Sequence, residues 1–324
     1  MKIWVAVVLA YLLSPASPQK IEPRDAYGND LPIMAGASLL VGNPPFFLMV
    51  TNAHENLMLQ RESNQPETRD GTSVYPSISR DGKTIAYARV KAGSPERILA
   101  ISTYDATAGK RTDYSEGEYS GSVAISPDAS RLAFSAAQQR EGGPGDNHMH
   151  IIDLKTGQES LGPAVSPQWP VFASWSPDSN RLVYSFNGEV RVWNSATGAV
   201  STIAEGDLPA WSPSGEWIAY LEGAWDSDLK RFVFMPGEWG PRCLVVHPDG
   251  TGGKTVLNDP HRKKFARVLV EPPVWSPDSR SILLNELANV DTGAVNIDIL
   301  DLRTMKPRTA LKNSLRVLGW AVAN

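Results

Sequence analysis

Short apolar runs alternate along most of this chain with turn sequences rich in serine, proline, aspartate and glycine. The clearest example is Trp275-Ser276-Pro277-Asp278, which leads through three polar residues into the apolar run at 282–284. Ser-Pro-Asp fits a type I turn, because serine is favoured at its first position and proline presets the backbone at its second. The flanking Trp, Ile, Val, Tyr and Phe residues are typical of strands. The unit therefore predicts a β-hairpin.

This hairpin unit recurs five times, and a second signal follows each copy. The other four copies have their turn serines at Ser79, Ser126, Ser176 and Ser212. After each hairpin comes another apolar run, which closes in most copies on a turn like the one at 153–157, Asp-Leu-Lys-Thr-Gly, and then a short fourth run. Nearly continuous apolar runs predict strands buried on both faces. Four antiparallel strands in each repeat are typical of a β-propeller blade.

The two ends of the chain supply the rest of the predicted ring. After the fifth copy, the run at 315–321 places Trp320 where Trp275 stands in its own repeat. We interpret this run as the inner strand of a sixth blade, with partners from the N-terminal runs at 37–41, 45–50 and 57–59. Such pairing removes the open sheet edges. The prediction is an all-β, six-bladed β-propeller of four-stranded antiparallel blades at 35–324, closed by pairing N-terminal strands with the C-terminal strand.

The repeat resembles a known family. Its succession of Trp-Ser-Pro-Asp-Gly, Ile-Ala-Tyr and Asp-x-x-Thr-Gly is similar to the TolB-type (WD-like) β-propeller repeat of bacterial envelope proteins, over residues 73–324. Three copies depart from it, with Ala129, Ser179 and Ser279 where glycine is expected, and a left-handed backbone there has a modest cost. The resemblance implies a docking role, since the TolB propeller binds a peptidoglycan-associated lipoprotein. Family members often carry an α/β domain ahead of the propeller, which we expect this chain to lack.

The first residues have the pattern of a secretory leader. Lys2 is followed by an apolar stretch at 3–13 and by Ser14-Pro15-Ala16, which has the form of a cleavage site. The stretch is shorter than the roughly 20 residues that span a bilayer, so we expect a signal peptide at 1–16, a linker at 17–34 and no membrane insertion after cleavage. The predicted location is the periplasm or the extracellular space. Cys243 is the only cysteine, and we expect it to be a buried free thiol.

Composition and charge narrow the classes of partner. Hydrophobic residues make up 42% of the chain and charged residues 20%, which is enough apolar material for a continuous core. The net charge is −4, so nothing favours nucleic acid or anionic lipid as a partner. The expected partner is a protein or a cell-envelope component, and the oligomeric state is left open.

Blade geometry predicts which face carries function. The Ser-Pro-Asp and Asp-x-x-Thr-Gly turns are expected on one face, and the connections of variable length on the other, where binding commonly occurs. The long connections are at 138–148, 223–242 and 258–267. Aromatic and arginine side chains are typical of binding hot spots. The candidate binding residues are Trp225, Arg231, Phe232, Phe234 and Trp239, with a basic patch at Arg262, Lys263 and Lys264. The alternatives are that the rings pack over a neighbouring blade and that the basic patch is simply solvated.

The sequence offers few candidate catalytic or metal-binding residues. His148 and His150 alternate by two, so on a strand they would face one side and could share a metal with Asp146. The alternative is a hydrogen-bonded strand end. The sequence has no Gly-x-Ser-x-Gly nucleophile motif and no zincin motif, so no catalytic residue is assigned and no cofactor is expected. The leading hypothesis is a secreted or periplasmic propeller that binds protein or envelope components through its long-loop face. The alternatives are a channel-mouth enzyme, such as a metal-dependent lyase or hydrolase on sugars or lactones, and a purely structural subunit.

Overall fold

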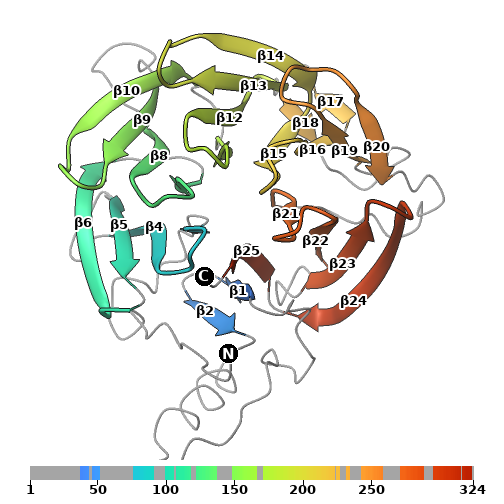
Figure 1. The fold of residues 1–324 in the computed structure, drawn as a ribbon, viewed down its shortest axis with the longest axis horizontal. Helices are drawn as coiled ribbons and strands as arrows, with labels where there is room; N and C mark the ends of the chain where they lie inside the picture. The colour runs from blue at the N-terminus through green and yellow to red at the C-terminus, as the bar shows by residue number, and fades with distance from the viewer. Residues whose placement is uncertain are drawn as a thin grey trace, which may run out of the picture.

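All regular secondary structure that the structure describes is β-strand (Figure 1). The structure is a computed structural model. The residues that it describes are 37–43, 46–51, 76–90, 99–105, 107–117, 122–136, 148–165, 171–222, 224–226, 231–233, 242–257, 271–287, 295–314 and 316–322. Five four-stranded antiparallel sheets, here called blades I to V, follow one another along the chain. Strand A is the innermost strand of each blade and strand D the outermost.

The blades follow the repeat units of the sequence. Blade I contains β3 (Ser77–Ile78), β4 (Thr84–Val90), β5 (Leu99–Asp105) and β6 (Lys110–Gly117), and blade II contains β7 (Ala124–Ile125), β8 (Arg131–Ala136), β9 (His148–Asp153) and β10 (Glu159–Ala164). Blade III contains β11 (Ala173–Trp175), β12 (Arg181–Phe186), β13 (Glu189–Asn194) and β14 (Val200–Glu205). Blade IV contains β15 (Asp207–Trp211), β16 (Ile218–Glu222), β19 (Arg242–Val246) and β20 (Lys254–Leu257), and blade V contains β21 (Val274–Trp275), β22 (Ser281–Leu287), β23 (Val295–Asp301) and β24 (Lys306–Ser314).

The ring is closed by strands from both ends of the chain. β25 (Arg316–Val322) pairs antiparallel with β1 (Ala37–Asn43), which pairs with β2 (Phe46–Thr51). The inner strands β3, β7, β11, β15, β21 and β25 are neighbours in this order, and β25 also contacts β3. The predicted closure by N-terminal and C-terminal strands is confirmed.

The predicted blade count is wrong. The described residues form five four-stranded blades, and the closing sheet has three strands in the order β2, β1, β25. The run at 57–59, which the prediction assigned to this sheet, lies outside the described residues. The count failed because the closing sheet carries neither of the two turn signals that delimit strands in the other blades, so apolar runs alone had to define its strands.

The hydrophobic core lies between the blades. Ile101 of blade I packs in one buried cluster with Leu132 of blade II, and Trp175 of blade III packs with Ile151 of blade II. Similar clusters join blade III to blade IV and blade IV to blade V. The B strands are buried on both faces, as their continuous apolar runs predicted, the described A strands are buried or half-buried, and the D strands are largely exposed. Each blade is therefore stabilised by its neighbours, as expected for a repeat architecture.

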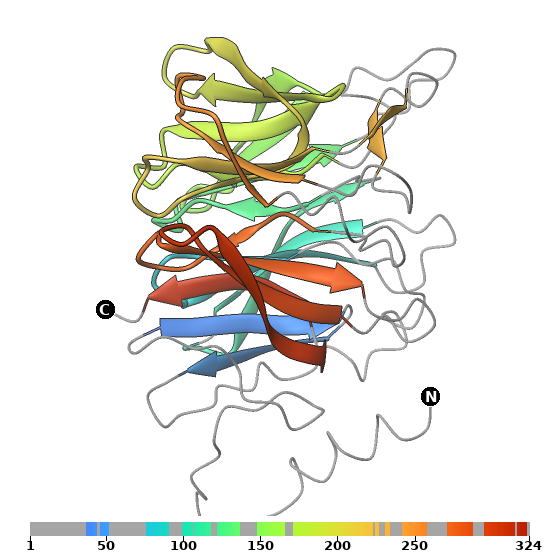
Figure 2. The same ribbon diagram turned by 90° about the vertical axis from the view of Figure 1, so that its right-hand side faces the viewer.

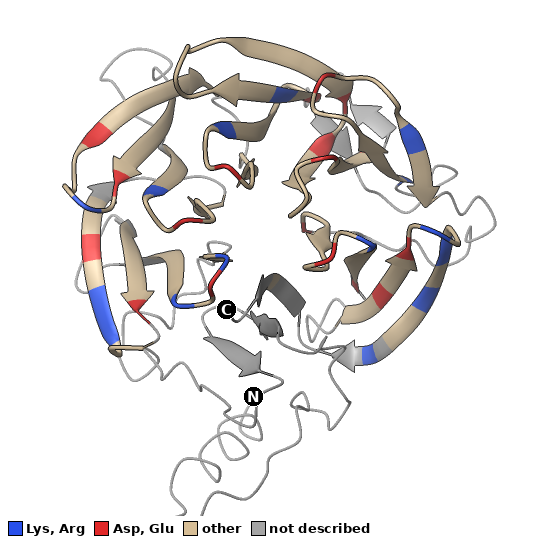
Figure 3. Cartoon of the chain, in the orientation of Figure 1, with Lys and Arg blue, Asp and Glu red and all other residues tan. Residues whose placement is uncertain are grey.

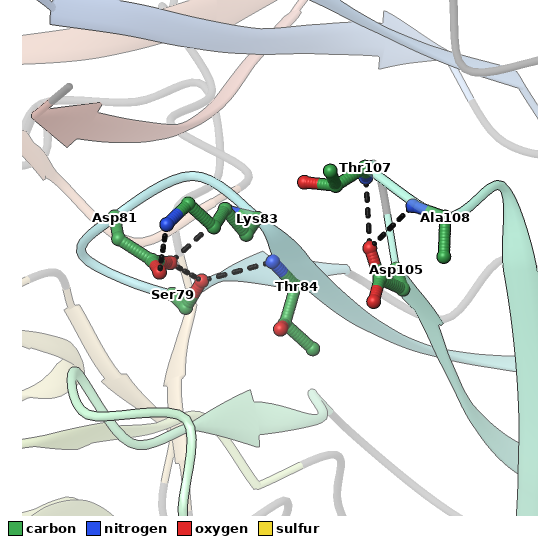
Figure 4. A network of polar contacts seen from close by, with 7 residues as sticks. All are labelled: Ser79, Asp81, Lys83, Thr84, Asp105, Thr107 and Ala108. Atoms are coloured by element: carbon green, nitrogen blue, oxygen red, sulfur yellow. Dashed lines mark hydrogen bonds and ion pairs between the residues drawn. The ribbon is translucent and has the colours of Figure 1, made fainter.

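The A–B turns follow one hydrogen-bonding scheme, shown for blade I in Figure 4. Ser79 donates its hydroxyl proton to the carboxylate of Asp81 (2.7 Å) and accepts the backbone N–H of Thr84 (3.0 Å). The backbone N–H of Lys83 also donates to Asp81, at 3.0 Å. All five motif serines are buried. The serine of the motif thus satisfies the backbone of the turn from inside the blade.

The fourth position of each A–B turn has a left-handed backbone, with φ of 54° at Ala129, 59° at Ser179 and 57° at Ser279. The sequence predicted this conformation at these non-glycine positions. Ser279 also uses its side chain, because its Oγ accepts the backbone N–H of Ser214 in blade IV at 2.9 Å. A non-glycine residue at this position has a cost in backbone energy, but its side chain can form a hydrogen bond with the neighbouring blade.

We expect Ala129→Gly to raise the free energy of unfolding by about 0.5–1 kcal/mol, because glycine relieves the left-handed strain and only part of this gain is offset by unfolded-state entropy. Ser279→Gly relieves the same strain but removes the acceptor of the Ser214 N–H, so it should give no gain. Chemical denaturation of both variants checks this expectation. Equal stabilisation by both would show that the contact between the blades contributes nothing.

The C–D turns lie on the same face as the A–B turns. In blade I, the carboxylate of Asp105 accepts the backbone N–H groups of Thr107 and Ala108, both at 2.8 Å (Figure 4). Backbone hydrogen bonds join the two kinds of turn within a blade, for example from the Leu154 N–H to the Ser130 carbonyl at 2.8 Å. The predicted separation of short turns from long connections is therefore correct for these blades. We call this side the turn face and the opposite side the long-loop face.

Candidate functional site

The inner strands surround an axial cavity of about 250 Å³. Its lining comes from all five blades and from Gly319 of the closing sheet. Prolines are frequent in the wall: Pro76, Pro127, Pro177, Pro209, Pro213, Pro272, Pro273 and Pro277. The charged residues in the lining are Arg80, in an A–B turn, and Glu271, which precedes β21 and is only 4% exposed. The chain direction therefore places a cationic group towards the turn face and a buried carboxyl group towards the long-loop face.

Serine side chains fix the wall of this cavity. The Oγ of Ser77 accepts the backbone N–H of Ile125 in the next blade at 2.7 Å. In the same way, Ser174 accepts the N–H of Trp211 at 3.1 Å. These bonds join neighbouring inner strands that share no ladder hydrogen bonds. The cavity is thus a preformed part of the scaffold.

Trp175 and Trp275 of the repeat pack between neighbouring blades. Trp175 is buried and donates its indole N–H to the Ala124 carbonyl at 3.2 Å. Trp275 makes the equivalent bond to Ala210 at 3.0 Å. The guanidinium group of Arg131 lies 4.9 Å from the centre of the Trp175 ring. The indole N–H groups are thus used between blades, while Trp175 and Trp275 also contribute to the lining of the axial cavity.

The polar groups of the turn face are largely committed to local hydrogen bonds. Partial burial acts to raise the pKa of Asp128, but hydrogen bonds from Ser126 and Ser130 outweigh it and hold that pKa below the ordinary value of 3.8. The same balance lowers the pKa of Asp81 and that of Asp178. These carboxylates stabilise the turns, and this structural role explains why aspartates are repeated on the turn face.

This arrangement predicts an acid-sensitive contribution to stability. The folded-state pKa of Asp128 lies below its unfolded value, so its contribution is complete above the unfolded pKa and is lost as the pH falls through the folded pKa. We expect the difference in unfolding free energy between the wild type and Asp128→Asn to be larger at pH 7 than at pH 3. Urea unfolding of both proteins at the two pH values measures it. A difference that is independent of pH would contradict the prediction.

The structure describes only part of the aromatic segment that was predicted for the long-loop face. Between β16 and β19 the chain forms a two-stranded hairpin of β17 (Ala224–Asp226) and β18 (Arg231–Val233), in which Trp225 is paired with Phe232. Figure 2 shows this hairpin on the side of the molecule opposite to the end of β25. The structure thus places the backbone of Trp225, Arg231 and Phe232 on one projecting hairpin. Five candidate residues lie outside the described residues: Phe234, Trp239, Arg262, Lys263 and Lys264.

The predicted histidine pair lies on one strand, β9, as expected. His150 is 5% exposed, its Nδ1 forms a short hydrogen bond with a carboxylate oxygen of Glu159, and its ring stacks on Phe134 with centroids 5.3 Å apart. Asp146, the third proposed ligand, lies outside the described residues. Where the structure describes the chain, no three His, Cys, Asp or Glu residues are grouped as metal ligands would be. The described contacts of His150 thus fit the alternative of a hydrogen-bonded strand residue.

Two further expectations concern Cys243 and the membrane. Cys243 is free and fully buried, as predicted, and burial raises the pKa of its thiol to about 12. A thiol with that pKa is not a nucleophile at neutral pH. Within the described parts of the chain, no helix is long and apolar enough to span a bilayer.

The cavity residues were not identified from the sequence. One signal could have indicated them: a proline stands three residues before the motif serine in three repeats, at Pro76, Pro209 and Pro273. Proline cannot donate to a sheet ladder and is found at edge strands or strand starts. Pro76 and Pro273 directly precede an innermost strand and Pro209 lies within one, and all three line the axial cavity.

A ring of antiparallel blades that is closed by the two chain ends around an axial channel defines the protein as a β-propeller. Solved structures of this class resemble it. TolB from Acinetobacter baumannii is 14% identical with a TM-score of 0.61, and the match covers 88% of this chain and 66% of TolB. A nidogen/laminin complex gives a TM-score of 0.56 at 10% identity, covering 89% and 99%. Oligogalacturonate lyase in complex with manganese gives 0.54 at 11% identity, covering 86% and 74%.

These matches support the predicted fold type. The chain has the fold of a TolB-type β-propeller. It spans about two thirds of the length of the Acinetobacter TolB. No protein-family profile and no curated protein matches the sequence.

Proposed function

We propose that this propeller is a secreted or periplasmic binding module, to which a protein or another cell-envelope component docks on the long-loop face. The observation that carries the proposal is the difference between the two faces. On the turn face, side chains such as Ser79 and Asp105 bind the backbone of their own short turns. The long-loop face bears the projecting β17–β18 hairpin and the end of the axial cavity next to Glu271. Projecting segments on a rigid scaffold commonly carry recognition.

The similar structures agree with this function. TolB and the nidogen/laminin complex have the same fold, and the second is by its description an assembly of two proteins. Fold similarity at this level of identity does not transfer a partner. The proposal therefore names a binding surface and leaves the identity of the partner to experiment.

The scaffold allows the projecting segment to be removed without disturbing the blade. Glu222, where β16 ends, lies directly opposite Arg242, where β19 begins, and their side chains form an ion pair of 2.6 Å. In blade III, the equivalent strands are joined by Asn187 and Gly188 alone, both with positive φ. Asn-Gly is the preferred two-residue hairpin connection. A blade of this protein can therefore close without a long connection.

The test is to replace residues 223–241 by Asn-Gly and to compare capture of partners from a cell-envelope extract. We expect the wild type to retain a partner that the shortened protein does not, with binding then reproduced using the purified component. Lys155→Ala, on a C–D turn of the turn face, is the matched control and should bind normally. Equal thermal stability of the three proteins has to be established first. Unchanged capture by the shortened protein, or loss with Lys155→Ala, would refute the proposed surface.

An enzyme acting at the channel mouth is the second candidate, because the oligogalacturonate lyase that resembles this chain holds manganese. The metal ligands predicted for it are His148 and His150, although β9 is the third strand from the axis and neither histidine lines the axial cavity. The candidate predicts that manganese raises the melting temperature of the wild type and has no such effect on His150→Ala. If manganese leaves the wild-type melting temperature unchanged, this candidate is rejected and the binding module is unaffected.

A further inference from the structure

The C-terminal part of the chain has an unusual charge distribution. Although the whole chain has a net charge of −4, there is no acidic residue after Asp301. Five basic residues fall in the same segment: Arg303, Lys306, Arg308, Lys312 and Arg316. Three of them belong to β24, the outermost strand of blade V, and all three are exposed. The other described outer strands differ, since β6 has two basic and two acidic residues, β10 and β14 each have one acidic residue, and β20 has one lysine.

The cations of β24 form a row on the rim of the propeller. Figure 3 shows them as blue bands along the outer strand of blade V. A strand advances about 3.3 Å per residue, so Lys306 and Arg308 are roughly 7 Å apart along the strand and Lys312 is roughly 20 Å from Lys306. Lys306 and Arg308 take part in none of the ion pairs that the described residues form. The row is therefore an exposed, linear cationic surface.

Edge protection explains only part of this surface. Lysine, proline and β-bulges keep exposed edge strands from pairing with other chains, and β24 has all three, with Pro307 and two register shifts against β23. A single lysine is present on the four-residue strand β20, whereas β24 has three cations within seven residues. Protection of the edge therefore does not require so many charges.

The same features limit what can bind there. Pro307 has no N–H, and two register shifts interrupt the ladder between β23 and β24, so these features disfavour the pairing of an extended acidic peptide along β24 as a fifth strand. Recognition of an anionic membrane typically uses a broad cluster of about four to eight basic residues, whereas β24 presents three cations in a single row. A linear polymer with regularly repeated anionic groups needs neither strand pairing nor a broad basic surface.

We propose that the outer strand of blade V binds a linear anionic polysaccharide, which runs along the strand and pairs its acidic groups with Lys306, Arg308 and Lys312. This surface is on the rim, separate from the long-loop face. The interaction is electrostatic, so it weakens as the salt concentration rises. It does not depend on the partner proposed for the long-loop face.

The test compares binding of dextran sulfate with binding of uncharged dextran of the same length. The variant is Lys306→Gln/Arg308→Gln/Lys312→Gln. Its matched control, Lys110→Gln/Arg111→Gln/Lys155→Gln, removes three exposed cations from blades I and II and changes the net charge equally. We expect the wild type and the control to bind dextran sulfate but not dextran, and the β24 variant to bind about tenfold more weakly with a smaller salt dependence.

Several outcomes would overturn the proposal. Equal losses in the β24 variant and the control would indicate attraction by net charge alone. If the β24 variant aggregated but bound dextran sulfate as tightly as the wild type, the role of the three cations would be to protect the strand edge. Polyglutamate and vesicles containing anionic lipid serve as further probes. If polyglutamate bound more tightly than dextran sulfate, with the same dependence on the β24 cations, the ligand would be an acidic protein and not a polysaccharide. The same result with the vesicles would indicate a membrane.

Discussion

Replacing Trp175 by alanine is expected to lower the free energy of unfolding by about 3–5 kcal/mol, the range typical of a large aromatic residue removed from a core. Trp175 is 4% exposed and packs in the cluster between blades II and III. The substitution leaves a cavity between two blades, removes the hydrogen bond to the Ala124 carbonyl and releases the stacked Arg131. Blades II and III are held together largely by this cluster, so the loss affects the ring as a whole.

Equilibrium denaturation of Trp175→Ala measures this effect. Leu161→Ala is the control, because Leu161 is 63% exposed on an outer strand and its truncation should change the stability by about 0.5 kcal/mol or less. Trp175→Phe keeps most of the ring volume but not the N–H, so it is expected to fall between the wild type and Trp175→Ala. A loss of unfolding free energy below about 1 kcal/mol for Trp175→Ala would show that the packing of this ring between the blades is not essential.

Replacing Ser126 by alanine is expected to cost about 2–3 kcal/mol, although only one oxygen atom is removed. The buried Oγ of Ser126 accepts the backbone N–H groups of Arg131 (2.9 Å) and Ser130 (3.1 Å) and donates to Asp128 at 2.6 Å. Alanine leaves these partners of the turn without the hydroxyl. The cost is that of a part-buried Arg131 N–H left without this acceptor, together with the lost bonds to Ser130 and Asp128, and it is larger than the value of an average hydrogen bond; the Ser130 N–H keeps its second acceptor, Asp128.

The matched comparison is Ser212→Ala in blade IV. The Oγ of Ser212 accepts the Trp217 N–H at 3.0 Å, but the third residue of its turn is Ser214 and not aspartate. We therefore expect Ser212→Ala to be less destabilising than Ser126→Ala, as measured by the same denaturation experiment. The reverse order would mean that the carboxylate is not an essential part of the turn.

Most of the fold could be predicted because its information is local and repeated. A Ser-Pro-Asp turn and the residues around it make nearly all of their defining hydrogen bonds within five positions, for example from Arg131 to Ser126. Five copies of such a unit predict five blades. The closing sheet depends on the pairing of residues such as Leu39 and Trp320 from opposite ends of the chain. Apolar runs show which segments can pair, but not how many strands the sheet contains, and there the prediction was wrong.

The candidate sites were less predictable because they depend on neighbours from other strands. The spacing of His148 and His150 placed both correctly on one strand, but Glu159, which bonds to His150, lies on the next strand across a turn. The cavity wall could not be predicted for the same reason, since residues such as Ser77 and Glu271 line it only after the ring is assembled. Sequence spacing describes one strand at a time, whereas a site on this scaffold is formed by several blades.

The pairing of β1 with β25 also has a consequence for the order of assembly. β1 is among the first strands to be made and β25 is the last, so the ring cannot close until synthesis of the described chain is complete. The entropic cost of joining distant segments grows only with the logarithm of their separation, so the closed ring loses little stability from this arrangement. During synthesis, however, the edges of β1 and of the newest blade stay unpaired. Ring closure therefore comes after all five blades have been made, and a chaperone that shields open strand edges would act on this protein before that step.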